Sequence, residues 1–218
     1  MQTGFDLTLS FDNGPDAAVT PRVLDILARR DIRATFFVLG QKLADPQLRA
    51  LAALAHDQGH WIGNHTFTHS VPLGEQRGPV AEREIGQTEA LIGPLAHPDK
   101  LFRPYGGGGA LHPGLMKESV VTYLTEHDYT CVLWNSVPGD WKDPDGWVDV
   151  ALDACGARPW TLMVLHDLPT GAMAHLDRFA AKVIDLGGRF RQDFPPDCVP
   201  IVRGDIVLPL DPYVSDMP

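Results

Sequence analysis

The sequence predicts an α/β barrel, in which parallel strands alternate with helices that cover them. Two observations support this fold class. Strand-like and helix-like segments alternate along most of the 218 residues, and polar residues suited to catalysis follow the strands. Such alternation is typical of a parallel sheet with covering helices. Six or seven of these units fit a closed or nearly closed barrel better than a small open sheet, and the length suits a single domain spanning residues 1–218.

Turn and capping residues delimit the elements in the first half of the chain. We expect a strand at 7–11, a helix at 20–29, a strand at 34–39, a helix from 46 that ends before 59, a strand at 60–63 and a helix at 84–92. Thr20-Pro21 and Asp45-Pro46 each supply a cap followed by a first-turn proline. The apolar residues of the second helix recur at helical spacing until Gly59, a residue that commonly ends helices.

The second half continues the alternation and ends in a proline-rich tail. We expect a strand at 101–103, a helix at 113–127, a strand at 130–134, a helix at 147–155, a strand at 161–165 and a helix at 172–186. Pro113 is well placed to open its helix, and the last strand is a continuous apolar run. The tail at 194–218 is expected to pack as irregular structure with a short strand at 199–202.

Composition argues against some classes of partner. The chain carries 18 Lys+Arg against 28 Asp+Glu, and this formal net charge of -10 argues against general binding of nucleic acid or anionic membranes. No apolar run approaches the ~20 residues that span a bilayer. The 3 cysteines show no C-x-x-C spacing, which favours reduced thiols, and no secretion signal follows Met1. We therefore expect a cytoplasmic protein.

Polar residues with catalytic potential lie at the ends of the predicted strands. Asp12 follows the first strand, His65 the third, Arg103 the fourth, Asp140 the fifth and His166 the sixth. Barrel enzymes carry their chemistry on the rim formed by the carboxyl ends of the strands. These five residues are therefore expected to lie on one rim.

Two of the segments have both a chemical and a structural interpretation. His65 and His69 are spaced i, i+4, and on a helical turn both rings would lie on one face and could share a metal ion. Taken alone they could instead be surface histidines that cap a loop, but the carboxylates expected at the same rim favour metal ligands. The segment Asp12-Asn13-Gly14-Pro15, considered by itself, consists of residues that favour a turn at the end of a strand.

Arg103 and His166 both require partners. Arg103 lies in a strand expected to be buried, where a guanidinium needs a carboxylate, and Asp12 and Asp140 are the candidates. His166 closes an apolar strand, and its structural interpretation is a histidine at the core edge bonded to Asp167. A metal-assisted amide hydrolase needs this combination of metal ligands, a carboxylate base, an arginine that orients the base and a histidine acid.

These motifs, which lie between about Leu7 and Leu186, resemble the NodB-homology domain, the polysaccharide deacetylases of carbohydrate esterase family 4. The resemblance implies a distorted (β/α) barrel and a divalent metal ion, usually zinc. It also implies N-deacetylation of N-acetyl sugars in chitin, peptidoglycan or related glycans. The substrate is thus expected to be a glycan or a related small molecule.

The resemblance also implies roles for individual residues. The family motif T-F-D-D-G-P corresponds to S-F-D-N-G-P in this chain, which places Asp12 at the base and Asn13 at a metal ligand. The motif H-S/T-x-x-H corresponds to His65 and His69, the other two ligands. The remaining implied roles are Arg103 as the residue that orients the base, Tyr105 as a backbone donor to the oxyanion, Asp140 in the catalytic set, His166 as the acid, and Trp141 and Leu165 as walls of the pocket for the acyl methyl group.

Asn13 is the departure from the family pattern. Its amide oxygen can ligate a metal but carries no charge, which should weaken metal retention. Activation of water should survive, because an all-neutral three-histidine zinc site lowers the pKa of its water to about 7. A metal-independent amidase and a non-catalytic carbohydrate-binding barrel remain alternatives. Retention of Asp12, Arg103, Asp140 and His166 favours a hydrolase, since a binding protein needs no acid–base pair.

We therefore predict a metal-dependent hydrolase of a carbon–nitrogen amide bond, most simply an N-deacetylase of an N-acylated sugar or small amide. The absence of a secretion signal fits a soluble small substrate better than a cell-wall polymer.

Overall fold

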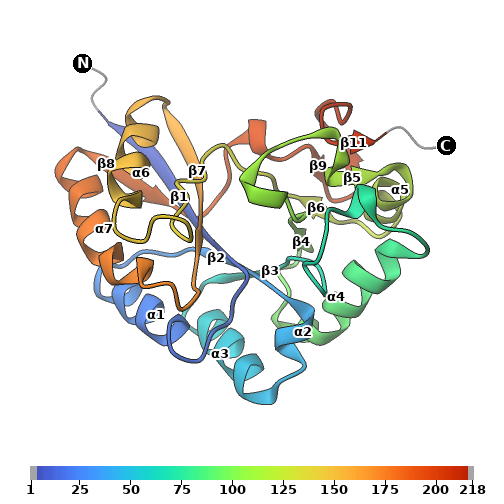
Figure 1. The fold of residues 1–218 in the computed structure, drawn as a ribbon, viewed down its shortest axis with the longest axis horizontal. Helices are drawn as coiled ribbons and strands as arrows, with labels where there is room; N and C mark the ends of the chain where they lie inside the picture. The colour runs from blue at the N-terminus through green and yellow to red at the C-terminus, as the bar shows by residue number, and fades with distance from the viewer. Residues whose placement is uncertain (1–3, 216–218) are drawn as a thin grey trace.

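The centre of the molecule is one curled sheet, which Figure 1 shows as a deep arc. The computed structural model describes residues 4–215, so the predicted domain limits at 1 and 218 lie outside the described residues. The strands are β1 (Phe5–Asp12), β2 (Thr35–Val38), β3 (Trp61–Asn64), β4 (Leu101–Phe102), β5 (Met116–Lys117), β6 (Thr130–Cys131), β7 (Trp160–His166), β8 (Gly188–Arg191), β9 (Ile201–Val202), β10 (Asp205–Ile206) and β11 (Val214–Ser215).

The order of the strands explains the curl. In the main sheet the order is β10-β9-β6-β4-β3-β2-β1-β7, with β8 paired to β1 beside this path. The pairs from β6 through β7 are parallel, whereas β9 is antiparallel to both β6 and β10. A bridge between Ser136 and Met163 links the segment after β6 to β7, the two margins of the parallel part. The parallel strands therefore curl into the distorted barrel that the sequence predicts.

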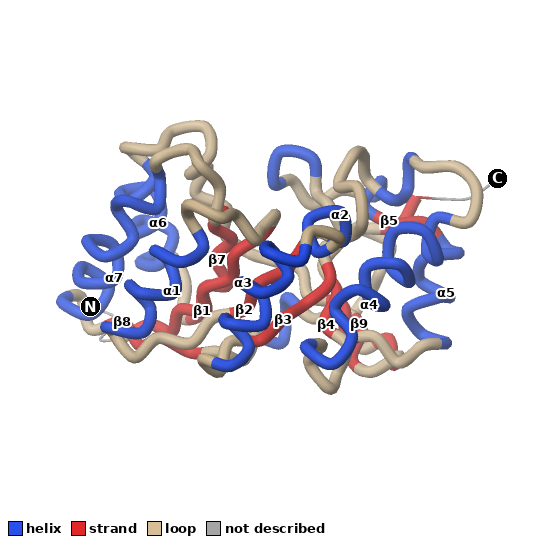
Figure 2. Tube along the Cα trace, turned by 90° about the horizontal axis from the view of Figure 1, so that it is seen from below, coloured by secondary structure: helices blue, strands red, loops and turns tan. Residues whose placement is uncertain are grey.

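Helices cover the outside of this arc, as Figures 1 and 2 show. The α-helices are α1 (Thr20–Arg29), α2 (Gly40–Leu43), α3 (Pro46–Asp57), α4 (Gln87–Ile92), α5 (Glu118–Glu126), α6 (Trp147–Gly156) and α7 (Leu176–Asp185), and a π-helical turn, η2 (Glu82–Gly86), precedes α4. Both prolines lie in the first turn, Pro21 in α1 and Pro46 in α3. The cap expected at Thr20 is wrong, because Thr20 is the first residue of α1, its N-cap is Val19 and no side chain caps it. Asp45 does cap α3 by accepting the backbone N–H of Gln47.

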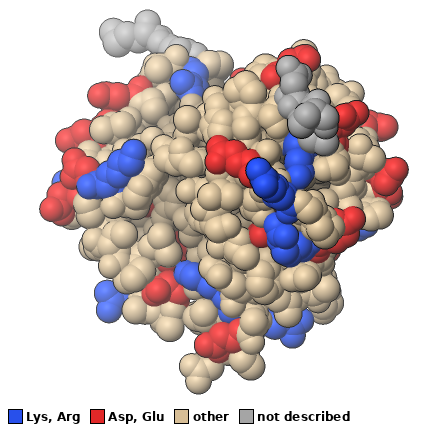
Figure 3. Space-filling model, turned by 45° about the vertical axis from the view of Figure 1, so that its right-hand side comes forward, with Lys and Arg blue, Asp and Glu red and all other residues tan. Residues whose placement is uncertain are grey.

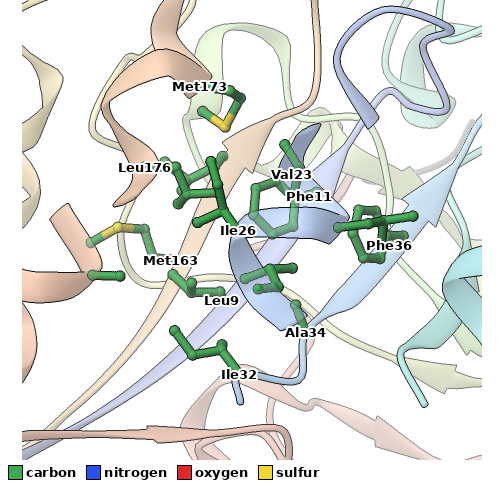
Figure 4. Packing of buried hydrophobic residues seen from close by; sticks show 14 of the residues in the cluster. Leu9, Phe11, Val23, Ile26, Ile32, Ala34, Phe36, Met163, Met173 and Leu176 are labelled. Carbon is green, nitrogen blue, oxygen red and sulfur yellow. The ribbon is translucent and has the colours of Figure 1, made fainter. Parts of the chain in front are cut away.

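Side chains along β1 alternate strictly between the hydrophobic core under the helices and the inside of the barrel. Leu7, Leu9 and Phe11 belong to a fully buried cluster with α1, α6 and α7, and Figure 4 shows Leu9 and Phe11 close to Val23 and Ile26 of α1. Successive side chains of a strand point to opposite faces. Ser10 and Asp12 therefore point inward, away from the helices, and both are buried.

A separate, smaller cluster fills the inside of the barrel. Its buried members are Phe37, Leu101, Val132, Leu162 and Cys198, which come from β2, β4, the segment after β6, β7 and the C-terminal tail. Phe36 and Val38, the neighbours of Phe37, belong instead to the cluster under the helices. The barrel interior is thus packed with side chains and forms a solid floor beneath the rim, as in other barrels of this size.

Some elements differ from the sequence prediction. The helix expected at 113–127 begins only at Glu118, because a single 3₁₀ turn and the short strand β5 occupy residues 113–117. The strand expected at 199–202 is shorter and is followed by an antiparallel partner, β10. Strand β8 was not predicted, since its four residues are mostly half-exposed and lack an apolar run.

The surface carries charges of both signs. Figure 3 shows acidic and basic side chains interspersed over one face of the molecule, in keeping with a chain that has 18 basic and 28 acidic residues. Within residues 4–215, none of the helices combines the length and apolar character that crossing a membrane requires.

Candidate active site

Strand register brings the predicted residues to one rim. Asp12 at the end of β1 is paired with His166 at the end of β7. His65 and Arg103 directly follow β3 and β4, whose register pairs Asn64 with Phe102. Because these strands are parallel, their carboxyl ends meet at the same edge. The structure therefore places Asp12, His65, Arg103 and His166 together, as the sequence analysis expected.

The carboxylate partner of Arg103 is Asp12. Arg103 is fully buried, and its Nη1 donates to Asp12 Oδ1 at 2.8 Å and to Ser10 Oγ at 2.7 Å. The other donors reach the backbone carbonyls of Val132, at 3.1 Å, and Leu133, at 3.0 Å. Burial alone would raise the pKa of Asp12, but the charge and hydrogen bond of Arg103, together with the nearby His65 and His166, lower that pKa below its ordinary value. Asp12 is therefore an ionised carboxylate at neutral pH.

Only one oxygen of Asp12 is held by the arginine. The other, Oδ2, lies 3.5 Å from His65 Nε2, and Asp12 itself lines the pocket. The guanidinium also stacks over Phe37 at 4.0 Å, which fixes its plane on the barrel floor. This arrangement leaves Oδ2 as the oxygen that can accept a proton inside the pocket.

A second pair, His166 with Asp140, lies beside the first, because His166 is paired in register with Asp12. Asp140 is fully buried, and its Oδ1 lies 2.9 Å from His166 Nδ1 while its Oδ2 accepts the backbone N–H of His166. Burial opposes the charged form of His166, yet the hydrogen bond and the charge of Asp140 raise its pKa above the ordinary value. Because Nδ1 points to a carboxylate, Nε2 is the nitrogen left for the pocket. The alternative partner, Asp167, is bonded instead to Thr20.

The two histidines of the predicted metal pair lie on an irregular loop. The expectation of a helical turn is wrong, because Thr66 and His69 have positive φ angles of 71° and 51° and the segment that follows β3 is not helical. The rings nevertheless approach each other, with centroids 4.9 Å apart. Burial, together with the nearby His65, lowers the pKa of His69 to about 3, and burial also lowers the pKa of His65. Both rings are therefore neutral at physiological pH, as metal ligands must be.

The side chains at this corner fit a divalent metal ion. His65 Nδ1 donates to the carbonyl of Arg103 at 2.9 Å, which leaves its Nε2 lone pair free. Asn13 Oδ1 is buried without a hydrogen-bond partner among the described residues, although Asn13, His65 and His69 line one pocket. Within residues 4–215, no group of three or more His, Cys, Asp or Glu side chains is arranged to hold a metal. The candidate set therefore depends on the amide oxygen.

The pocket has a volume of about 230 Å³ and mixed walls. Its lining residues are Asp12, Asn13, His65, His69, Pro104, Tyr105, Gly106, Gly108, Gly109, Trp134, Val137, Trp141, Val164, His166 and Leu168. Tyr105 packs on His69 with ring centroids 3.9 Å apart, and Trp141 packs on His166 at 4.7 Å. Both residues thus line the pocket, and the role of the Tyr105 backbone as oxyanion donor stays a prediction.

Leu165 does not line the pocket, so that expectation is corrected. Its side chain is fully buried in the cluster under the helices. The cause is the two-residue period of a strand, because Val164 and His166 point inward and the residue between them must point outward. Val164 and Leu168 supply the aliphatic wall instead.

Sequence reasoning also missed residues that support or line the site. Ser10 receives a hydrogen bond from Arg103 and donates to the carbonyl of Met163, which ties β1 to β7 below the base. Trp134 lines the pocket and donates through Nε1 to the carbonyl of Gly109, so it anchors the glycine-rich loop at 106–109, which also lines the pocket. Ser10 could have been found from the two-residue alternation that places it on the same face as Asp12, and Trp134 is the last residue of the strand predicted at 130–134.

Comparison with known proteins identifies the family. A sequence model of the polysaccharide deacetylases matches residues 2–132. The chain belongs to the polysaccharide deacetylase family. A chitooligosaccharide deacetylase of Rhizobium leguminosarum bv. phaseoli is 35% identical over 167 residues, which span 74% of this chain and 67% of that protein. This polysaccharide deacetylase family member is accordingly an enzyme.

Solved structures show the same fold. A family 4 carbohydrate esterase from Streptomyces lividans, in complex with acetate, superposes with a TM-score of 0.72 at 26% identity and covers 92% of this chain and 98% of its own. A family 4 acetyl xylan esterase from Clostridium thermocellum, in complex with a cobalt ion, gives 0.70 at 26% identity and covers 86% and 87%. The similarity confirms the distorted barrel of the NodB-homology type.

Proposed function

We propose that this polysaccharide deacetylase family member removes N-acetyl groups from N-acetylglucosamine oligosaccharides with the help of a divalent metal ion. The observation that carries the proposal is the pair of oriented groups that line one pocket, Asp12 held by Arg103 and His166 held by Asp140. The substrate class is taken from the chitooligosaccharide deacetylase that is 35% identical to this chain. We also propose that the enzyme prefers N-acetyl amides to O-acetyl esters.

Asp12 acts as the general base. Although burial opposes ionisation, Arg103 and the nearby histidines lower the pKa of Asp12 below the ordinary value, and its free oxygen faces the pocket beside His65. It accepts a proton from the water whose oxygen attacks the acetyl carbonyl carbon. Arg103 keeps the carboxylate in place through a fixed set of four acceptors, so the base cannot turn away from the pocket.

His166 acts as the general acid. Burial opposes the charged ring, but the hydrogen bond and charge of Asp140 raise its pKa and so favour the protonated form, and Asp140 holds Nδ1 so that the Nε2 proton is presented to the pocket. As the carbon–nitrogen bond breaks, this proton passes to the leaving nitrogen, and the products are acetate and a free amine. General acid or base catalysis of this kind contributes ~10²–10⁴-fold in rate.

Asn13, His65 and His69 would hold the metal ion. When bound, a divalent ion supplies Lewis acidity toward the acetyl carbonyl and lowers the pKa of water. Support for this corner comes from the unpartnered amide oxygen of Asn13, the two neutral imidazoles, and the cobalt ion in the related acetyl xylan esterase. The neutral ligand set predicts weak retention, because no ligand charge offsets that of the ion.

Acetate release from a chitooligosaccharide tests the proposal. The purified protein, supplied with zinc or cobalt, is incubated with N-acetylglucosamine oligomers and, in parallel, with an O-acetylated xylan, and products are identified by mass spectrometry. We expect free amine and acetate from the oligomers, and none from a folded Asp12→Asn variant. Absence of deacetylation of every N-acetyl sugar, or a preference for the xylan, would refute the substrate assignment.

Chelation separates the metal-dependent mechanism from the metal-independent amidase. Treatment with a chelator followed by metal analysis should remove both the ion and the activity, and adding back the ion should restore the activity. Full activity in protein shown to be free of metal would establish the alternative.

A further inference from the structure

A buried carboxylate outside the pocket holds the loop that carries the two histidines. Glu84, in the π-helical turn η2, is 1% exposed. Its Oε2 accepts the backbone N–H groups of Phe67, at 3.1 Å, and of Thr68, at 2.8 Å, and its Oε1 accepts the Thr68 hydroxyl at 2.9 Å. All three bonds fall on the segment between His65 and His69.

The opposite side of the same loop is held by other groups. The backbone N–H groups of Gly40 and Gln41, at the start of α2, donate to the carbonyls of Thr66 and Phe67 at 3.0 and 3.1 Å. Glu84 thus accepts hydrogen bonds from the backbone N–H groups of the loop, while the backbone N–H groups of α2 donate to the loop's carbonyls. The loop is therefore clamped between two separate elements, and neither touches the pocket.

The clamp opposes a backbone that would otherwise relax. Thr66 has φ 71° and His69 has φ 51°, in the left-handed region that residues with a side chain rarely adopt. Strained angles of this kind persist only where surrounding contacts over-determine them. Without Glu84 the amides of Phe67 and Thr68 lose their acceptor, and His69 loses its fixed position relative to His65.

We propose that Glu84 is a positioning residue that sets the metal affinity of the site by fixing His69 against His65. The inference rests on the metal-binding role assigned to these histidines in the proposed function. Glu84 acts through its hydrogen-bond acceptors, since its ion pair with Arg83 spans 3.7 Å and Arg83 is 42% exposed. An amide in its place can still accept both backbone N–H groups through its oxygen and donate through its nitrogen to the Thr68 hydroxyl.

Zinc titration of the metal-free protein by calorimetry tests this role without any substrate. Glu84→Met removes the acceptors but keeps the length of the side chain, Glu84→Gln keeps an acceptor, and Glu82→Met is the matched control at an exposed position of the same turn. We expect Glu84→Met to weaken zinc binding by ~10–100-fold, the usual effect of losing a group that orients metal ligands. Glu84→Gln and Glu82→Met should bind zinc like the wild type.

Circular dichroism at the titration temperature confirms that each variant is folded. If Glu84→Met does not fold, Thr68→Val provides the measurement, because it removes the hydroxyl bonds to Glu84 and to Ser70 but keeps the backbone bond to Glu84, and it should weaken binding to a smaller extent. Unchanged zinc affinity in the folded variant, an equal loss in Glu84→Gln and Glu84→Met, or no zinc binding by the wild type would each overturn the inference. Normal zinc results without deacetylation would instead refute the proposed function and leave the role of Glu84 intact.

Discussion

Replacing Arg103 with lysine should strongly destabilise the protein while keeping the buried positive charge. The arginine fills four acceptors, namely Asp12, Ser10 and the carbonyls of Val132 and Leu133. A lysine presents all its donors from one atom and cannot span both sides of this set. It can keep the carboxylate and the hydroxyl but leaves the two buried carbonyls unpaired.

The expected magnitude follows from these two carbonyls. A buried polar group without a partner costs about 1–3 kcal/mol, so Arg103→Lys should lower the free energy of unfolding by about 2–6 kcal/mol. For a domain of this size, each kcal/mol corresponds to about 2–4 °C in Tm. The Tm of Arg103→Lys is therefore expected to fall by at least about 4 °C.

Thermal and urea unfolding of metal-free protein, followed by circular dichroism, measures the effect without a contribution from ligand binding. Arg33→Lys is the matched control, because Arg33 is 42% exposed and its pair with Asp31 spans 3.6 Å, so its stability should stay within about 0.5 kcal/mol of the wild type. An Arg103→Lys protein that melts within about 2 °C of the wild type would refute the assignment of the four acceptors.

Three other substitutions test the site. Asp140→Asn removes the charge that raises the pKa of His166, so the alkaline fall of kcat, which follows loss of the His166 proton, should move to lower pH. An alkaline fall of kcat that stays at the same pH would contradict the assignment of His166 as the acid. Asn13→Asp adds a charged ligand at a backbone angle that aspartate tolerates, so zinc should bind more tightly, and equal affinities would remove Asn13 from the ligand set. Leu168 lines both the catalytic pocket and a neighbouring apolar hollow, so Leu168→Ala should raise activity on an N-butyryl sugar relative to the N-acetyl sugar, and an unchanged ratio would show that Leu168 does not limit acyl length.

The sequence predicted most of the strands and the rim residues because these depend on local signals. Prolines and caps mark helix starts, and polar residues after apolar runs mark strand ends. The partner of Arg103 was narrowed to two carboxylates, and only the three-dimensional structure could decide between them. Asp12 and Ser10 lie on the same inward face and both accept hydrogen bonds from Arg103, whereas Asp140 is hydrogen-bonded to His166.

The misplaced features have physical causes of two kinds. The histidine loop was expected to be helical because spacing does not reveal positive φ angles, which here are imposed by contacts with α2 and Glu84. Such contacts join residues distant in sequence and leave no pattern in it. Leu165 is a different case, since the alternation that places His166 in the pocket already requires its neighbour to face the core.

The tail has a consequence for the electrostatics of the base. Cys198 lies inside the barrel with Phe37 and Val132, and its carbonyl accepts the N–H of Leu133, whose own carbonyl binds Arg103. The tail thereby closes off the floor beneath the ion pair. A chain shortened before residue 194 would admit water to that floor, and a higher local dielectric weakens the attraction between opposite charges. The strength with which Arg103 controls Asp12 thus depends on a segment that carries none of the family's catalytic motifs.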